Sequence, residues 1–190
     1  APASNPGLVA MFSLRDRKPV PNLVPWAGEF VGKYLISTVQ ALRMSDDPEL
    51  KAVATAVVDA IIAGQAEDGY LGPFPKEERL LKHWDLWGHY HIILGLLMWH
   101  EQTGDERAKT TALKMGDFAC SVYLAGDRRV LDAGSDEMNL SIIHALGRLH
   151  RLTGKENYLQ MMRKIEAEWP EAGDYFNQGL AGVPFFRTPR

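Results

Sequence analysis

The chain has 190 residues, of which 46% are hydrophobic and 24% are charged, and its formal net charge at pH 7 is −3. This composition is typical of a folded globular chain, and the small net charge gives no reason to expect nucleic acid or an anionic membrane as a partner. The sequence shows no apolar run long enough to span a bilayer, and its only cysteine, Cys120, can form no internal disulfide. The compartment, whether cytoplasmic, periplasmic or secreted, stays open.

The N-terminal segment differs from the rest of the chain. Residues 1–26 hold five of the eleven prolines, and proline fixes φ and lacks a backbone donor. We therefore expect an extended, turn-rich lead-in over 1–26 and one domain over 27–190. The start, Ala-Pro-Ala without an initiator Met or an apolar leader, is interpreted as processed, engineered or truncated.

From residue 27 the apolar residues recur at helical spacing. The pattern predicts an all-α chain without strands. The six predicted helices lie at about 27–44, 48–64, 83–103, 105–124, 136–152 and 155–168.

The helices form three pairs, because the corner inside each pair has a similar sequence: "RMSDDPELKA", "EQTGDERAKT" and "RLTGKENYLQ". In the first corner Asp47 can cap the next helix, with Pro48 at its first position. In the other two, Gly104 and Gly154 can supply the left-handed residue that ends a helix. The corners repeat at periods of 58 and 50 residues, which indicates an α-solenoid or a closed α/α toroid.

The connectors between pairs favour the toroid. A tetratricopeptide array repeats at about 34 residues with short links. Here the connector over 64–82 is long and rich in Gly, Pro and aromatic residues, and long loops in a compact domain are usually functional. The sequence therefore predicts (α/α)6-toroid-like hairpins, about half of a full toroid. The first, third and fifth helices should line the inside, and their N-termini should converge.

Those three helices begin with aromatic and polar residues, which an ordinary amphipathic helix with capping acids would also show in part. Together, however, the residues are of the types that line carbohydrate pockets: aromatic faces cover the apolar side of a sugar, and carboxylates, amides and imidazoles bond its hydroxyls. We expect them to approach one concavity, with two residues of the 64–82 connector at its rim. The candidate substrate-binding residues are Glu29, Asp68, Tyr70, Trp84, Asp85, Trp87, His91 and Asn139. Asp136 and Glu137 are candidate catalytic acids.

No metal site is expected within this chain. His89 and His91 are two residues apart, so on a helix they point about 200° apart and cannot grip one ion. The other histidines show no ligand spacing, and Cys120 is interpreted as a small buried residue.

Four stretches resemble, in this order, the N-terminal half of the glycoside hydrolase family 127 group, the β-L-arabinofuranosidase-like proteins. They are "GEFVGKYL", "QAEDGYLGPF", "WDLWGHYHIILGLLMWHEQTGD" and "MNLSIIHALGRLHRLTG". The resemblance covers about residues 25–190 and implies an (α/α)6 toroid followed by β-sandwich domains. It also implies a pocket histidine on the third helix, where His91 stands. Near the start of the fifth helix, where the family tends to have histidine, this chain has Ser135, Asp136 and Glu137, and this departure leaves the arabinofuranoside specificity open.

The resemblance further implies a zinc-bound cysteine nucleophile and a glutamate acid/base downstream of this chain, so no cofactor is expected within it. The carboxylates available for catalysis are Glu29, Asp85, Asp136 and Glu137, and each stands where a capping acid would stand. We therefore expect the chain alone to be inactive and at most to bind sugar. The open edge of a half toroid is also expected to favour self-association.

The leading hypothesis is thus the substrate-binding part of a glycoside hydrolase that acts on side chains of plant or complex polysaccharides. The alternatives are another α/α-toroid sugar enzyme, of the unsaturated glucuronyl hydrolase or sugar epimerase type, and a non-catalytic helical-repeat interaction domain.

Overall fold

The structure, a computed structural model, describes residues 5, 7–126, 128–171 and 175–183 and contains no strand within them. The α-helices are α1 (Gly7–Leu14), α2 (Glu29–Met44), α3 (Pro48–Ala63), α4 (Asp85–Thr103), α5 (Glu106–Leu124), α6 (Asp136–Leu140), α7 (Ile142–Thr153), α8 (Glu156–Glu168) and α9 (Tyr175–Leu180). Two short 3-10 helices, η1 (Val130–Asp132) and η2 (Trp169–Glu171), complete the set. The prediction of an all-α chain is confirmed.

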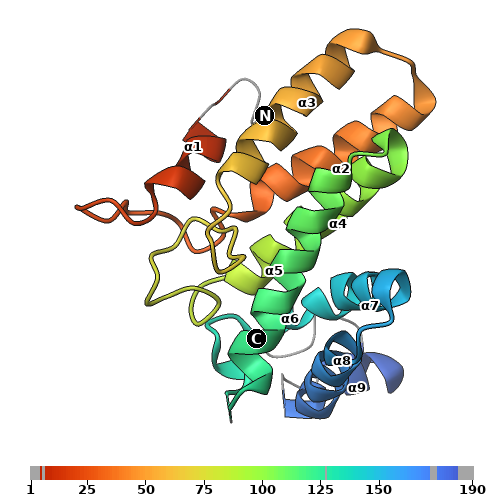
Figure 1. The fold of residues 1–190 in the computed structure, drawn as a ribbon. Coiled ribbons are helices and arrows are strands. Elements are labelled where there is room, and N and C mark those ends of the chain that lie inside the picture. Colours follow the sequence, from red (N-terminus) through yellow and green to blue (C-terminus); the bar gives the residue numbers. More distant parts are fainter. Residues whose placement is uncertain (1–4, 6, 127, 172–174, 184–190) are drawn as a thin grey trace.

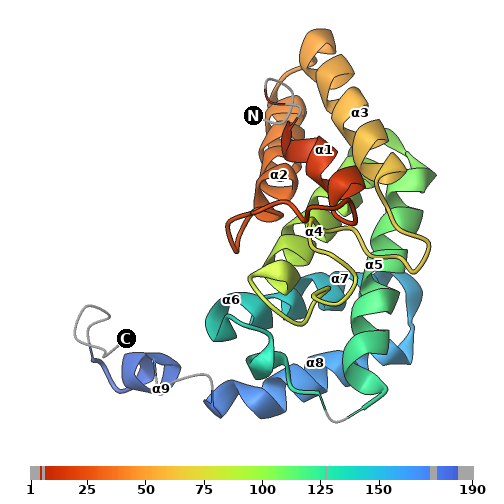
Figure 2. The ribbon, with the colours of Figure 1, turned by 90° about the vertical axis from the view of Figure 1, so that its left-hand side faces the viewer.

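Three helical hairpins stand side by side, α2 with α3, α4 with α5, and α7 with α8 (Figures 1 and 2). One layer consists of α2, α4 and α7, in which α4 packs against both of the others. The second layer consists of α3, α5 and α8, in which α5 packs against both of the others. The central helix α4 is buried around most of its circumference, as the uniformly apolar run from Ile92 to Trp99 requires.

The corners of the hairpins are formed as the sequence predicts. The Asp47 carboxylate accepts hydrogen bonds from the backbone N–H groups of Glu49 and Leu50 and so caps α3. Gly104 and Gly154 end α4 and α7 with φ values of 75° and 68°, in the left-handed region that glycine adopts without strain.

Glycines bring α2 and α4 into backbone contact. A Cβ atom added at Gly32 would lie 2.3 Å from the carbonyl carbon of His91, and one added at Gly95 would lie 2.8 Å from Cβ of Leu35. Near the helix starts, a Cβ at Gly88 would lie 3.4 Å from the carbonyl carbon of Gly28. Only residues without a side chain allow this approach, and it places the first turns of the two helices next to each other.

Two sequence expectations need correction. Residues 7–14 of the expected extended lead-in form α1, because its Phe12 is fully buried and Arg15, just after it, bonds the Gly64 carbonyl at 2.8 Å. The expected helix over 136–152 is divided into α6 and α7 at Ser141, whose N–H bonds Met138 three residues back at 3.2 Å. The first change follows from tertiary contacts that outweigh the local pattern, and at the second the chain forms a local turn.

Candidate functional site

The first turns of α2 and α4 meet at the side chain of Glu29. One Glu29 carboxylate oxygen, Oε1, is paired with Lys33 Nζ at 3.0 Å, and the other, Oε2, accepts a hydrogen bond from the Trp87 indole N–H. The Lys33 ammonium also lies over the Trp87 ring, 5.4 Å from its centroid. These contacts fix the orientation of the indole and leave neither oxygen of Glu29 without a protein partner.

His91 lies one turn further along α4, edge-on to Trp87 with ring centroids 4.4 Å apart. Both of its ring nitrogens are buried, and neither has a hydrogen-bond partner. Burial and, to a smaller extent, the nearby Lys33 charge lower the pKa of His91 from 6.5 to about 4, although Glu29 opposes the shift. At neutral pH the imidazole is therefore uncharged, with one nitrogen that can donate and one that can accept a hydrogen bond.

Tyr90 extends this cluster toward α7. Its ring lies 4.7 Å from that of His91, and its hydroxyl is 3.3 Å from Nδ1 of His144. From His144 a groove of about 890 Å³ continues between α4, α7 and α8. Its lining includes Leu97, Glu101 and Arg148, which come from the C-terminal halves of α4 and α7 rather than from their starts.

A second aromatic pair lies one turn before Glu29 and Trp87. The rings of Trp26 and Trp84 are 5.4 Å apart and inclined at 49°. Trp84 also donates its backbone N–H to the Pro25 carbonyl at 3.0 Å, which ties the segment before α2 to the start of α4. Trp26 leaves 39% of its surface exposed.

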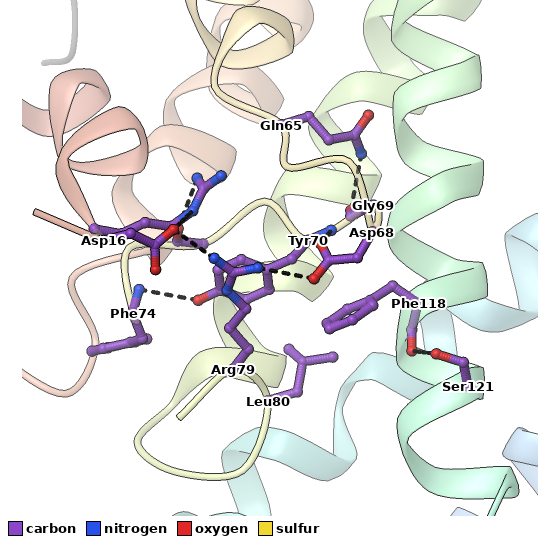
Figure 3. A network of polar contacts seen from close by, with 12 residues as sticks. Asp16, Gln65, Asp68, Gly69, Tyr70, Phe74, Arg79, Leu80, Phe118 and Ser121 are labelled. Carbon is purple, nitrogen blue, oxygen red and sulfur yellow. Dashed lines mark hydrogen bonds and ion pairs between the residues drawn. The ribbon is translucent and has the colours of Figure 1, made fainter. Parts of the chain in front are cut away.

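Tyr70, a connector residue expected at the rim of a pocket, is instead fully buried. Figure 3 shows its polar surroundings. Its hydroxyl donates to Oδ2 of Asp85 at 2.9 Å and accepts from the Phe74 N–H at 3.1 Å, and burial beside Asp85 raises the pKa of Tyr70 well above 10.0. Asp85 is itself 2% exposed and accepts from the Leu80 N–H at 2.8 Å. The expectation that Tyr70 and Asp85 open onto a concavity is therefore wrong, because both are used to hold the connector.

Asp68 belongs to the same network, as Figure 3 shows. Arg79 bonds Oδ2 of Asp68 at 2.9 Å and Oδ2 of Asp16 at 2.7 Å, and its guanidinium lies 4.8 Å from the centre of the Tyr70 ring. Asp68 is exposed, but its other oxygen accepts from the Tyr70 N–H at 3.0 Å. These ion pairs fix the shape of the connector and link it to the segment after α1.

Asn139 is also a structural residue and is fully buried. Its amide donates to the carbonyls of His83 at 3.0 Å and Ala133 at 3.1 Å, and its oxygen accepts from the Trp87 N–H at 3.2 Å. The expectation that Asn139 faces a sugar is therefore wrong, because its bonds to backbone join the starts of α4 and α6. The side chains of Asp136 and Glu137 lie outside the described residues.

Of the predicted residues, the structure thus gathers Glu29, Trp87 and His91, with Trp84 one turn away. Sequence reasoning missed Lys33, Tyr90 and His144. Lys33 could have been predicted from the sequence, since a lysine four residues after a glutamate on a helix commonly forms an ion pair with it. His144 could not have been predicted, because its approach to Tyr90 depends on how α7 packs against α4.

Cys120 is buried in α5, and burial together with the Asp117 charge raises its pKa to about 12, so it remains a thiol at neutral pH. In the described part of the chain, no group of three or more His, Cys, Asp or Glu side chains could hold a metal ion. The zinc implied by the family resemblance therefore does not fit these residues. A helix long and apolar enough to cross a membrane is likewise not found among them.

The family follows from comparison with known proteins. The profile of the family described as β-L-arabinofuranosidase, GH127 catalytic domain, matches residues 13–177, which is most of the chain. The chain therefore belongs to this family, and the sequence resemblance is confirmed.

Individual relatives agree with this assignment. The non-reducing end β-L-arabinofuranosidase of Bifidobacterium longum subsp. longum is 30% identical over 147 residues, which cover 71% of this chain and 22% of that protein. A β-L-arabinofuranosidase of this family from Geobacillus stearothermophilus T6 has a similar fold, with a TM-score of 0.66 at 23% identity over 83% of this chain and 26% of the other. Another family member, a β-arabinofuranosidase, gives a TM-score of 0.67 at 17% identity over 86% of this chain and 28% of the other. The chain thus spans about a quarter of the length of these relatives, and the predicted α/α-toroid hairpins are confirmed.

Proposed function

We propose that this chain supplies the substrate-binding part of a β-L-arabinofuranosidase-like glycoside hydrolase, which acts on side chains of plant or complex polysaccharides. The ligand of the site around His91 would be a β-L-arabinofuranosyl group at the non-reducing end of such a saccharide. The name of the Bifidobacterium relative motivates the choice of sugar and of chain end. The proposed binding involves no step at a metal.

The observation that carries the proposal is the pair of unpartnered, buried nitrogens on His91. A buried polar atom without a hydrogen bond costs about 1–3 kcal/mol. Among the described residues that have such atoms, His91 has two and each of the others has one. A sugar hydroxyl can both donate and accept, and it would satisfy either nitrogen of a neutral imidazole. The adjacent faces of Trp87 and Tyr90 would cover the apolar side of the ring.

A ligand must displace the groups that cover these nitrogens. Lys33 lies close enough to His91 for its charge to lower the pKa of the imidazole, and it can move at little cost, since its side chain is 44% exposed and a lysine stem is flexible. Its ammonium could then bond a sugar hydroxyl while Glu29 still holds the Trp87 indole. We therefore assign hydroxyl binding to His91 and Lys33, and orientation of Trp87 to Glu29.

The test is calorimetric titration with methyl β-L-arabinofuranoside of the wild type, His91→Phe and a control, His150→Ala. Phenylalanine keeps the ring and removes both nitrogens, so His91→Phe should fold at least as stably as the wild type but lose at least about tenfold in affinity. His150 is a histidine at the opposite end of α7, and His150→Ala should bind like the wild type. Binding that is unchanged in His91→Phe would contradict the assignment.

A further inference from the structure

We propose that Trp26 and Trp84 form a second sugar-binding position, so that the site takes an oligosaccharide whose second ring lies on this tryptophan pair. The inference rests on the proposed function, because it extends the binding site around His91. It assigns to Trp26 and Trp84 a ligand of one chemical class, a sugar ring linked to the ring held at His91.

The geometry of the α2–α4 crossing places the two positions in succession. Trp26 precedes Glu29 by three residues and Trp84 precedes Trp87 by three, so the tryptophan pair lies about one helical turn before the Glu29–Trp87 contact. Gly28 lies between Trp26 and Glu29, and there the backbones of Gly28 and Gly88 approach closely, with the Pro73 ring 3.2 Å from the position of a Cβ at Gly28. A saccharide leaving the His91 position in this direction would meet the tryptophan pair next.

The exposure and the unused hydrogen-bond donors of the two tryptophans are also suited to ligand binding. Trp26 remains 39% exposed and Trp84 is only partly buried. Within the described chain, neither indole N–H donates a hydrogen bond to a protein group. The pair therefore offers an indole face for the C–H groups of a sugar and free donors for its hydroxyls.

The residue before Trp84 in the chain, His83, is held in a strained conformation. His83, which precedes Trp84, is stacked on Phe74 at a centroid distance of 4.3 Å, and its Nε2 is 3.1 Å from Glu78. His83 has a positive φ of 64°, a conformation that is costly for a residue with a side chain. The Asn139 amide holds the carbonyl of His83 in this conformation. Strain retained beside an exposed aromatic pair is typical of a binding site.

The experiment compares methyl β-L-arabinofuranoside with an arabinofuranosyl disaccharide by calorimetric titration. The wild type should bind the disaccharide at least about tenfold more tightly, the gain expected from one additional aromatic contact. Trp26→Ala should lose that gain and still bind the monosaccharide like the wild type. Trp26→Phe, which keeps a smaller aromatic face, should retain part of it. The matched control is Phe30→Ala, since Phe30 is an aromatic residue of nearly the same exposure, 40%, and has no ring partner among the described residues. This variant should bind both sugars like the wild type.

The outcomes separate this inference from the proposed function. If the monosaccharide binds but the disaccharide gains nothing, or if Trp26→Ala and Phe30→Ala have the same effect, the tryptophan position is wrong and the His91 site stands. If the wild type binds neither sugar, both proposals fail. A thermal melt of each variant shows whether it is folded. If Trp26→Ala is not folded, the disaccharide affinity of Trp26→Phe tests the tryptophan position instead.

Discussion

His91 was singled out by the sequence, and the structure leaves both of its buried ring nitrogens without a hydrogen-bond partner. Its position on the same helical face as Trp84 and Trp87 follows from spacing alone, which is why these residues could be predicted. Tyr70, Asp85 and Asn139 are of equally suitable types, but their polar groups are used inside the protein. Residue type does not reveal whether a side chain faces a ligand or a backbone carbonyl, since that depends on how the connector folds back on α4 and α6.

The pH dependence of stability tests the environment of His91. Its folded pKa of about 4 lies below the ordinary value of 6.5, so between these pH values the unfolded chain binds more protons. Above about pH 6.5 His91 therefore has no effect on the pH dependence of stability, and as the pH falls toward 4 stability is lost, because protonation of His91 favours the unfolded chain. Relative to His91→Phe, the wild type should lose roughly 1–3 kcal/mol over this window, allowing for partial exposure.

The measurement is urea denaturation of both proteins at several pH values. The groups that the two proteins share titrate equally, so the difference between their unfolding free energies isolates His91. A difference that does not change between pH 6.5 and 4 would show that His91 is solvated rather than buried.

At the scale of elements, the helices were predictable because their apolar periodicity is strong and their corners carry Asp47, Gly104 and Gly154 as local signals. The exceptions lie at tertiary contacts. α1 exists because Phe12 enters the core, and the break between α6 and α7 lies next to Asn139, whose amide bonds Ala133 and His83 instead of facing solvent. Except for Ala133, the residues that Phe12 and Asn139 contact here are distant in sequence, so local patterns do not reveal these contacts.

The close contact of α2 and α4 can be tested with one methyl group. Gly32→Ala would place a Cβ 2.3 Å from backbone of α4, and backbone cannot move aside as a flexible side chain can. We expect this variant to lose about 2–4 kcal/mol of unfolding free energy, measured by urea denaturation.

Gly147→Ala is the matched control for this substitution. Gly147 is also inside a helix, but there the added Cβ would lie 3.5 Å from Cε of Met162, an ordinary contact. Alanine at this position should be neutral or stabilise by up to about 1 kcal/mol because it favours helix. Equal effects of the two substitutions would mean that the helices do not cross as described.

At the scale of the whole molecule, three hairpins form part of an α/α toroid, and the chain spans about a quarter of the relatives it matches. The layers could be predicted from the repeated corners. The contacts by which the connector, α1 and α6 hold the start of α4 could not be predicted. They consist of single hydrogen bonds between distant residues, such as those of Asp85 and Asn139. These bonds leave no periodic trace in the sequence.

We expect this chain by itself not to hydrolyse an aryl β-L-arabinofuranoside. Hydrolysis needs a proton donor and a nucleophile or base on opposite sides of the glycosidic bond. Both oxygens of Glu29 are bonded, by Lys33 and Trp87, and Asp85 is only 2% exposed, with its Oδ2 bonded by Tyr70 and Leu80, so neither carboxylate is placed for either role. Turnover that survives repurification and disappears in Asp136→Asn or Glu137→Gln would instead identify those two acids as catalytic.

The most direct test of the sugar site is nitrogen NMR of the histidine side chains during titration with methyl β-L-arabinofuranoside. The chemical shifts of the His91 ring nitrogens should change saturably at neutral pH, because a sugar hydroxyl forms a hydrogen bond to a nitrogen that has no partner in the free protein. His89, two residues away and fully buried on another side of α4, should not change. Saturable shifts at other histidines with none at His91, or no shifts at any histidine, would contradict the account.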